Sequence, residues 1–402
     1  MEITTILKRH RRRIVKEDKK VGFLRLFISK RLIQGAATAI LGIFVPIFLY
    51  KTTGQNFYVV GIYYAILSVL YALLLVPGMF LINRIGFTKS LVLGGVFSII
   101  IYSIMYVMDE HNFRSWLFFM VPAVVAFRIF HWVPYNVDFT LFTKDGERGR
   151  QVSLSFATIA FMGVVGPILA GFIIQNAGYE ALFATAVALL IAATVSYAFV
   201  PETNMHFDWT WRQTWQKLFS RKMRHVAVGE FANGAEVVVS TLVWPIFLFE
   251  TLNGDVFKVG AISTIVVGLT IIIQLFVGKH LDKKVATKEK TLKVGSSLYA
   301  LGWIFKIFVI SAAQVFVVGL YHNIVKIFTK TPFSTILFDM SAEQGKYVDE
   351  FSVLREISGH LGRAAALILI SVLSLFVPLG WTFVLAALAS LALNLVYRLE
   401  NG

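Results

Sequence analysis

The segments Pro46-Ile47-Phe48-Leu49-Tyr50 and Pro245-Ile246-Phe247-Leu248-Phe249 repeat almost residue for residue, 199 positions apart. The spacing continues without a gap through neighbouring residues and shrinks only slightly further along the chain. The spacing is 199 for Gly35 with Gly234, Gly61 with Gly260, Arg84 with Lys283 and Lys89 with Lys288. It is 198 for Arg128 with Lys326 and Pro134 with Pro332, and 196 for Gly163 with Gly359 and Gly166 with Gly362. So constant a shift predicts a chain made of two repeated halves.

The composition indicates a lipid environment for both halves. Hydrophobic residues make up 57% of the 402 residues and charged residues only 15%, against about 25% in a soluble domain. The formal charge of +15 is spread between apolar segments, which favours contacts with anionic lipid headgroups over nucleic acid. The absence of cysteine excludes disulfides and thiolate metal sites, and no metal or other cofactor is expected.

Apolar segments long enough to cross a bilayer occur twelve times, each about 20 residues or longer. They are predicted at 23–50, 57–82, 90–108, 115–142, 151–175, 179–200, 225–250, 257–280, 291–310, 312–338, 349–375 and 377–397. The sequence therefore predicts an all-α polytopic membrane protein with twelve transmembrane helices in two six-helix pseudo-symmetric halves. Its expected parts are a basic arm (1–22), the first half (23–200), a linker (201–224) and the second half (225–402).

Basic residues mark one side of the predicted bundle. The N-terminal arm and the loops after predicted helices 2, 4, 6 and 8 are rich in lysine and arginine, and the alternate loops are short or mixed. Because cytoplasmic loops carry this excess, both termini are predicted to be cytoplasmic, in the plasma or inner membrane of the cell. In the linker, Trp211, Trp215, Leu218 and Phe219 have helical spacing among basic residues, which predicts an amphipathic helix in the membrane interface.

Local motifs along the chain resemble those of the major facilitator superfamily. The loop after the second helix, residues 83–89, is similar to the family's G-x-x-x-D-R/K-x-G-x-R/K-R/K loop, with Asn83 in place of the acid. Residues 278–283 keep the glycine and acid spacing in the second half. Arg128 resembles the arginine of the fourth-helix motif, and Pro201-Glu202-Thr203 is a common ending of the sixth helix. The gating residues that this resemblance implies are Asn83, Arg84, Lys89, Asp282 and Lys283.

The fifth helix carries Gly166-Pro167-Ile168-Leu169-Ala170-Gly171. This segment is similar to the family's G-P-x-x-G-G motif, which is associated with exporters, and Gly166, Pro167 and Gly171 are the matching residues. The resemblance covers nearly the whole chain. It implies a fold in which helices 1, 4, 7 and 10 line a central cavity, with the halves rocking about the solute.

Charged and polar residues inside the predicted spans are candidates for the solute and proton pathway, because such groups normally face a cavity or a partner. On helix 4, Arg128, His131 and Asp138 share one face. The full predicted set is Gln34, Arg128, His131, Asp138, Asn233, Glu236, His322 and Lys326. We expect Arg128 to pair with Glu236 when the site is empty and with an anionic solute when it is full.

These features predict a secondary active transporter of a small solute, coupled to protons and acting as an exporter by alternating access. No phosphate-binding Gly-x-x-x-x-Gly-Lys-Ser/Thr loop and no catalytic motif is present, so neither ATP hydrolysis nor an enzyme is expected. A monomer is expected to be the functional unit. Import of an organic anion by uniport or symport, or a receptor without transport, remain as alternatives.

Overall fold

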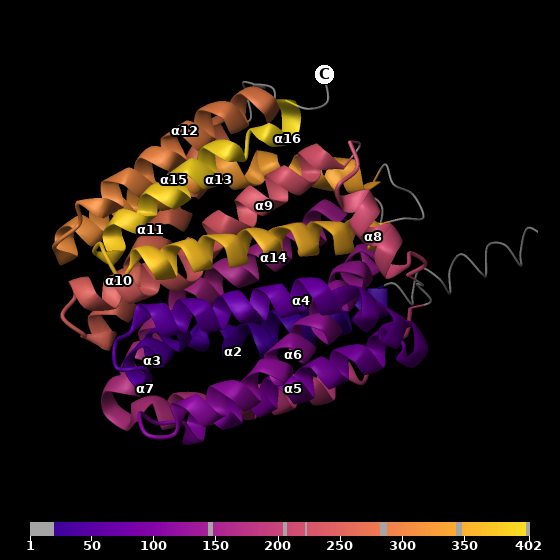
Figure 1. The fold of residues 1–402 in the computed structure, drawn as a ribbon, viewed down its shortest axis with the longest axis horizontal. Helices are drawn as coiled ribbons and strands as arrows, with labels where there is room; N and C mark the ends of the chain where they lie inside the picture. Colours follow the sequence, from indigo (N-terminus) through magenta and orange to yellow (C-terminus); the bar gives the residue numbers. More distant parts are fainter. Residues whose placement is uncertain are drawn as a thin grey trace, which may run out of the picture.

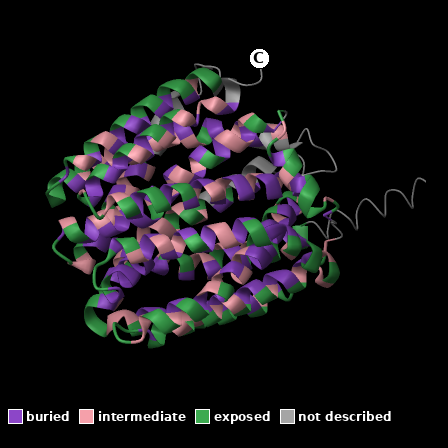
Figure 2. Cartoon of the chain, in the orientation of Figure 1, coloured by how far each residue is buried: buried purple, intermediate pink, exposed green. Residues whose placement is uncertain are grey.

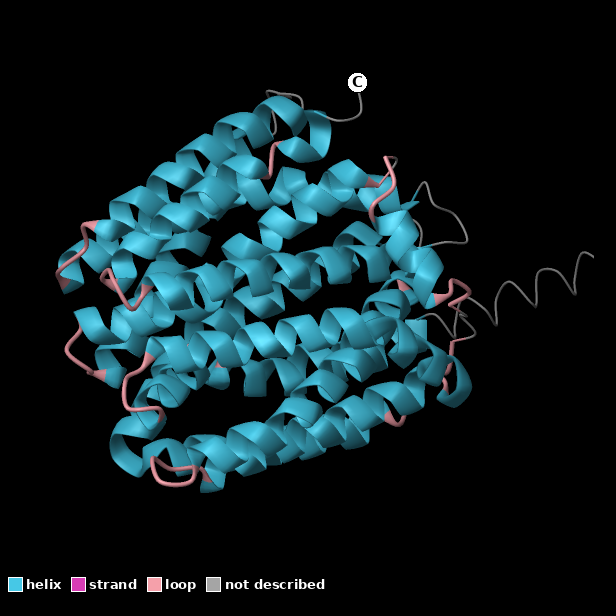
Figure 3. Ribbon diagram, in the orientation of Figure 1, coloured by secondary structure: helices cyan, strands magenta, loops and turns pink. Residues whose placement is uncertain are grey.

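The computed structural model describes residues 20–143, 148–203, 207–221, 223–281, 288–342 and 348–398, and this part of the chain contains helices and no strands (Figure 3). The predicted residues Asp282 and Lys283, and the arm up to residue 19, lie outside it. The first half contains η1 (Phe27–Ile33), α2 (Gln34–Leu41), α3 (Phe44–Thr52), α4 (Phe57–Ile85), α5 (Phe87–Val107), α6 (Phe113–Phe142) and α7 (Arg148–Tyr197).

The short helix α8 (Trp211–Leu218) follows in the linker. The second half contains α9 (Arg224–Val238), η2 (Val239–Val243), α10 (Trp244–Thr251), α11 (Val256–Leu281), α12 (Lys288–Ile307), α13 (Ala312–Ala342), α14 (Val348–Leu373), η4 (Leu379–Thr382), α15 (Phe383–Ala392) and α16 (Leu395–Arg398). In Figure 1 the two halves lie side by side, with indigo to magenta helices below and orange to yellow helices above.

The described helices cross the bundle twelve times, as predicted. Nine stretches are long and apolar enough to span a membrane by length and composition. One of them contains two crossings, because α7 reverses at Gly178, whose φ of 80° lies in the left-handed region that glycine adopts without strain. The remaining two crossings are α12, which begins among charged residues, and the run of η4, α15 and α16. The predicted ends differ from the observed ones by four residues or fewer.

The repeated Pro46 and Pro245 explain why the first helix of each half is interrupted. Proline has no backbone N–H to donate to the carbonyl four residues earlier, so the helix is weakened there. In the first half the break separates α2 from α3 at Gly42 and Ile43. In the second half the same region is the π-helical turn η2. One sequence motif thus bends the first helix of both halves at the same depth.

The turns that follow these two helices also repeat. Two successive residues have positive φ in each turn, Gly54 and Gln55 in the first and Asn253 and Gly254 in the second. The next helices begin at equivalent caps: Asn56 Oδ1 accepts a hydrogen bond from Val59 N, and Asp255 Oδ1 accepts one from Lys258 N. The hydrogen bonds and charge of Lys258 lower the pKa of the half-buried Asp255 below its ordinary value. The repeat therefore extends from sequence to backbone conformation.

The outer surface of the bundle is apolar. Exposed side chains along it include Phe118, Phe161, Phe172, Ile310 and Phe376, and Figure 2 shows exposed residues running along the outer helices. A soluble protein does not expose this much apolar surface, whereas lipid tails cover it without cost. The protein is therefore a multi-pass integral membrane protein.

The linker helix α8 forms as the sequence predicts. Thr210 and Gln213 close a capping box at its start, which satisfies two of the unpaired backbone donors there. Leu218 is buried against the bundle, whereas Trp211 and Phe219 are exposed. The helix is thus tethered to the bundle and still offers aromatic side chains outward; its place in the membrane interface stays a prediction.

Candidate substrate cavity between the two halves

A cavity of about 200 Å³ lies where the two halves meet. The halves contact each other mainly along two helix pairs, α4 with α14 and α7 with α11. The cavity is lined from the first half by Pro46, Tyr64, Ser68 and Arg128, and from the second half by Val237, Val238, Thr241, Leu242, Arg363 and Leu367. A solute in this space touches both halves at once.

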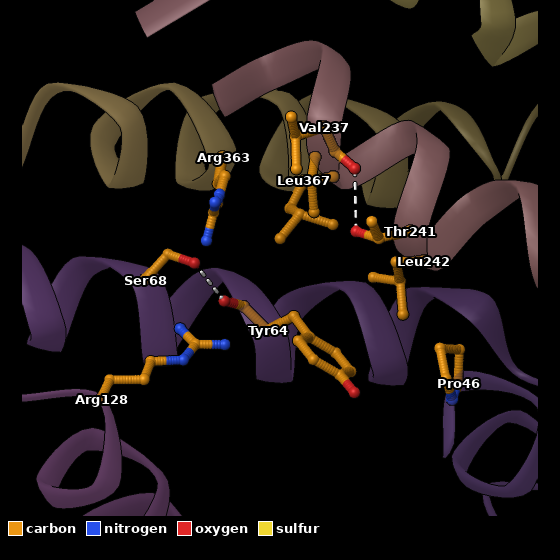
Figure 4. Close-up of a pocket in the computed structure, with 10 residues that line it drawn as sticks. Pro46, Tyr64, Ser68, Arg128, Val237, Thr241, Leu242, Arg363 and Leu367 are labelled. Atoms are coloured by element: carbon orange, nitrogen blue, oxygen red, sulfur yellow. Dashed lines mark hydrogen bonds between the residues drawn. The ribbon is translucent and has the colours of Figure 1, made fainter. Parts of the chain in front are cut away.

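Two arginines from opposite halves enter this cavity. Figure 4 shows Arg128 from α6 and Arg363 from α14 approaching the same space beside Ser68. Arg128 Nη1 and Arg363 Nε are both buried without a hydrogen-bond partner, and the cavity lining contains no aspartate or glutamate. Burying polar donors without partners is costly, so these two cations leave the empty cavity electrostatically unsatisfied.

Two hydroxyl groups of the lining donate hydrogen bonds within their own helices. Ser68 Oγ donates to the Tyr64 carbonyl at 2.9 Å, and Thr241 Oγ1 donates to the Val237 carbonyl at 2.8 Å. Each of the two arginines in the lining therefore has a buried nitrogen available for a solute, and most of the remaining lining residues are apolar.

An acid–histidine pair lies next to the cavity on α14. Arg363 Nη1 is 3.2 Å from His360 Nε2, and His360 Nε2 is 3.9 Å from Glu356 Oε2. The Tyr71 ring of α4 packs against the His360 ring, with 4.2 Å between the ring centroids, and its hydroxyl donates to Glu356 Oε2 at 3.4 Å. This group joins α4 to α14 and supplies one negative charge near the two arginines.

The structure places three predicted pathway residues inside the first half. Lys30 Nζ lies 2.7 Å from His131 Nε2, Tyr197 donates to Gln34 Oε1 at 2.5 Å, and Thr203 donates to Asp138 Oδ1 at 2.5 Å. His131 packs against Gly94 of α5, away from the cavity between the halves. Arg128 lies at the edge of the face of α6 that carries His131 and Asp138. The long side chain of Arg128 reaches the interface between the halves.

Three more predicted residues belong to a charged cluster in the second half. Glu236 Oε2 is 2.5 Å from Lys330 Nζ, and Glu236 Oε1 accepts a hydrogen bond from Tyr299 at 2.6 Å. Lys330 also donates to Asn233 Oδ1 at 2.6 Å, and the charge of Lys326 acts on Glu236. The expected pairing of Arg128 with Glu236 is therefore wrong: the carboxylate is held by a lysine of its own half.

A second ion pair extends this cluster. Arg355 Nε of α14 is 2.6 Å from Glu230 Oε1, and Glu230 Oε2 accepts a hydrogen bond from Asn233 Nδ2 at 3.0 Å. Asn233 thus connects the Glu236–Lys330 pair to the Glu230–Arg355 pair. A change of charge at any one of these groups is felt by the others through direct contacts.

His322 lies between two aromatic rings. Its ring is 4.4 Å from the Tyr299 ring and 4.5 Å from the Trp303 ring, and neither ring nitrogen has a hydrogen-bond partner. Lys306 is enclosed in the same region, 3.9 Å from the Trp244 ring and 4.0 Å from the Trp303 ring.

Several site residues were missed by sequence reasoning. Lys30, Lys306 and Lys330 each lie within an apolar span, and that is the signal that could have identified them. Of the eight predicted pathway residues, Arg128 lines the described cavity; for the other seven, a role in the pathway stays a prediction.

The fifth-helix motif lies at the interface between the halves. A β-carbon on Gly260 of α11 would collide with the Pro167 carbonyl group, and one on Gly171 would lie 3.1 Å from the Val256 carbonyl oxygen. Thr264 Oγ1 donates to the Val164 carbonyl at 2.6 Å across the same pair of helices. The glycines thus allow α7 and α11 to approach at backbone distance.

The ends of the first helices of the two halves also meet. The Tyr50 hydroxyl donates to Glu250 Oε1, so α3 and α10 are joined at the end of the bundle opposite α8 (Figure 1). Together with the contacts of α7 and α11, this hydrogen bond joins the two halves at that end of the bundle.

One of the predicted gating residues of the first half, Asn83, contacts the linker. Asn83 donates to the Phe207 carbonyl at 2.8 Å and accepts from Phe207 N at 3.0 Å. An asparagine can do both, whereas the carboxylate of the family's usual aspartate only accepts. Arg84 and Lys89 are exposed. Glu202 accepts a hydrogen bond from Phe87 N at 2.6 Å and thereby caps α5.

Comparisons with known proteins agree with this arrangement. Residues 31–362 match the sequence model of the Major Facilitator Superfamily. Over 248 residues the chain is 23% identical to the uncharacterized protein YqgE of Bacillus subtilis (strain 168). The match covers 60% of this chain and 57% of YqgE, so it spans little more than half the length of that relative.

Solved structures of transporters share the fold. A POT family transporter in complex with 5-aminolevulinic acid has a TM-score of 0.64 and 11% identity, covering 94% of this chain and 95% of that chain. A mutant of the peptide transporter POT in complex with alafosfalin has a TM-score of 0.65 and 11% identity, covering 95% and 96%. A POT family transporter in complex with a thioalcohol conjugated peptide has a TM-score of 0.66 and 10% identity, and the match covers 94% of this chain and 95% of that chain.

Proposed function

Because the chain belongs to the major facilitator superfamily and is a membrane transporter, we propose that it moves a small solute by proton-coupled alternating access. The observation that carries the proposal is the cavity at the interface, whose lining comes from both halves. A site shared in this way changes when one half rocks on the other, so solute binding and rocking are linked.

Contacts at one end of the bundle support alternating access. The hydrogen bond from Tyr50 to Glu250 and the close approach of Pro167 to Gly260 tie the halves together at the end opposite α8. A solute that leaves toward that end has to separate these contacts. They include backbone contacts and single hydrogen bonds, which can form in one state and break in the other.

The Glu236 cluster supports coupling to protons. Glu236 is fully buried within a membrane-spanning helix, and its charge is balanced by Lys330 and Lys326. Protonation of this carboxylate removes the ion-pair partner of Lys330, which also donates to Asn233, and Asn233 in turn contacts Glu230. A proton can therefore change the contacts between α9, α13 and α14. The fifth-helix motif, Gly166, Pro167 and Gly171, favours export as the direction.

Flux into proteoliposomes tests transport and coupling together. We expect at least one solute among ¹⁴C-labelled succinate, lactate, glycerol 3-phosphate, putrescine and glucose to accumulate under an imposed pH gradient, and a protonophore to abolish the accumulation. Glu236→Gln keeps the hydrogen bond with Tyr299 but cannot release a proton, so gradient-driven accumulation should be lost while exchange of solute across the membrane continues. Glu110→Gln, in an exposed loop, is the matched control.

Two results would count against this proposal. Flux of every solute no greater than in protein-free liposomes would contradict transport. Normal gradient-driven accumulation by Glu236→Gln would contradict the proposed proton site and leave transport intact. Solute that accumulates only when added on the α8 side would support export if that side proves to be cytoplasmic.

Single cysteines test that orientation, because the natural chain has none. We expect a cysteine at Lys217, in α8, to be protected from a membrane-impermeant maleimide in intact cells, and a cysteine at Asn253 to be labelled. The basic loops lie on the α8 side, which predicts that this side is cytoplasmic. Labelling of position 217 and protection of position 253 in sealed cells would reverse the topology.

A further inference from the structure

We propose that Arg128 and Arg363 form a clamp for a small organic anion, one guanidinium from each half. This inference rests on the proposed function, since it names the class of solute that the interface cavity takes. Both side chains line the same cavity, and each has a buried nitrogen without a hydrogen-bond partner. An anion with two oxygen atoms, such as a carboxylate or a phosphate ester, supplies the acceptors that both groups lack.

The charge balance of the site favours an anion. Two guanidinium groups face the cavity, whose lining contains no acidic residue. The acid near them is Glu356, which interacts with Arg363 but is contacted directly by His360 and Tyr71 rather than by either arginine. Two positive charges and one negative charge leave an excess of one positive charge. A solute with at least one negative charge completes the balance.

The rest of the lining favours an organic solute over a hydrated inorganic ion. Pro46, Val237, Val238, Leu242 and Leu367 form an apolar wall beside the arginines. The volume of about 200 Å³ is below the roughly 300–1,000 Å³ of sites for drug-sized ligands. The geometry therefore fits a metabolite-sized molecule with a short carbon skeleton and an anionic end.

The clamp also links binding to the movement of the halves. Arg128 belongs to α6 in the first half and Arg363 to α14 in the second, so like charges face each other across the interface when the cavity is empty. An anion between them replaces repulsion by two attractive contacts and draws the halves together. A solute without negative charge cannot do this, so specificity and closure depend on the same two residues.

Thermal unfolding of the purified protein in detergent tests the clamp without any need for flux. The probes are sodium butyrate, disodium succinate and sodium glycerol 3-phosphate, with butyramide, succinamide and glycerol as matched neutral compounds at equal ionic strength. We expect at least one anion to raise Tm by about 3 °C or more, and its neutral match to leave Tm unchanged. Arg128→Gln and Arg363→Gln should each remove the shift, while Arg114→Gln, an exposed arginine, should keep it.

A second measurement separates the clamp from a purely structural role. Without ligand, removing one of two facing cations relieves repulsion, so Arg128→Gln and Arg363→Gln should unfold at the wild-type temperature or above it. A structural role predicts a lower Tm for both. The clamp is overturned if neutral compounds stabilise as well as anions, if sodium chloride alone reproduces the shift, if no anion shifts Tm, or if either glutamine variant keeps the shift.

These outcomes are distinct from failure of the proposed function. Flux of a neutral or cationic solute through the wild-type protein, together with no anion-induced shift, would overturn the clamp and leave a transporter. Anion-induced stabilisation that depends on both arginines, together with no flux of the bound anion, would support the clamp and contradict transport.

Discussion

Gly234→Ala should leave little or no folded protein. A β-carbon built on Gly234 of α9 would collide with the carbonyl oxygen of Gly359 on α14, and would lie 2.7 Å from its carbonyl carbon and 2.9 Å from its Cα. All three are backbone atoms, so no side chain can rotate away and the two helices have to separate. Overpacking typically costs about 1–3 kcal/mol and more where relief needs backbone movement, against a total stability of about 5–15 kcal/mol.

The control for this change is Gly35→Ala, at the equivalent position of the first half. The nearest atom to a β-carbon there is the Lys30 carbonyl oxygen, at an ordinary 3.5 Å. Alanine also favours the helix by roughly 0.5–1 kcal/mol over glycine, so this variant should fold at least as well as wild type. The two variants are compared by their folded yield on size-exclusion chromatography and by their Tm. Equal losses in the two variants would show that the close approach of α9 and α14 is wrong.

Glu236→Leu is the second change with a large expected effect. The carboxylate is fully buried, and its removal leaves Lys330 without its ion-pair partner, Lys326 without its balancing charge and Tyr299 without an acceptor. Breaking a buried ion pair on one side typically costs about 3–5 kcal/mol, because the remaining charge is uncompensated. We expect a fall in stability of about that size, measured as a loss of Tm and of folded yield in detergent.

The double variant Glu236→Leu with Lys330→Met separates charge from packing. Removing both partners removes the uncompensated charge, so most of the lost stability should return, although gradient-driven flux should not. The pair Glu230→Leu with Arg355→Met is the comparison, since Arg355 is 27% exposed and water can stabilise it. Glu230→Leu alone should therefore lower the stability by less than Glu236→Leu does. A double variant at Glu236 and Lys330 as unstable as Glu236→Leu would mean that the ion pair does not explain the loss.

Much of the fold follows from local sequence. Twelve apolar spans, the order of the helices and the two halves could be predicted because bilayer thickness sets the length of each span and a constant shift relates the halves. Individual residues also have local effects: Gly178 reverses α7, and Pro46 and Pro245 interrupt the first helix of each half. These effects depend on backbone chemistry within a few residues, so they can be predicted from the sequence.

The partners of the charged residues could not be predicted in this way. The helical spacing of Arg128, His131 and Asp138 defines a face of α6, but not the neighbours that this face meets or how far each side chain reaches. In the structure Arg128 meets Arg363 of the other half, whereas Glu236 pairs with Lys330 of its own half. The sequence by itself determined that these charges lie within the membrane and therefore need partners.

One pair of equivalent glycines shows the same difference between what the sequence determines and what the tertiary structure decides. Gly35 and Gly234 are equivalent in sequence, yet only Gly234 faces the backbone of another helix at a distance that excludes a β-carbon. Hydropathy and repeat spacing act along the chain, so the sequence determined the helices, their order and the two halves. Tertiary packing brings together residues far apart in the chain, so only the structure decided which glycine allows close packing and which two arginines share one cavity.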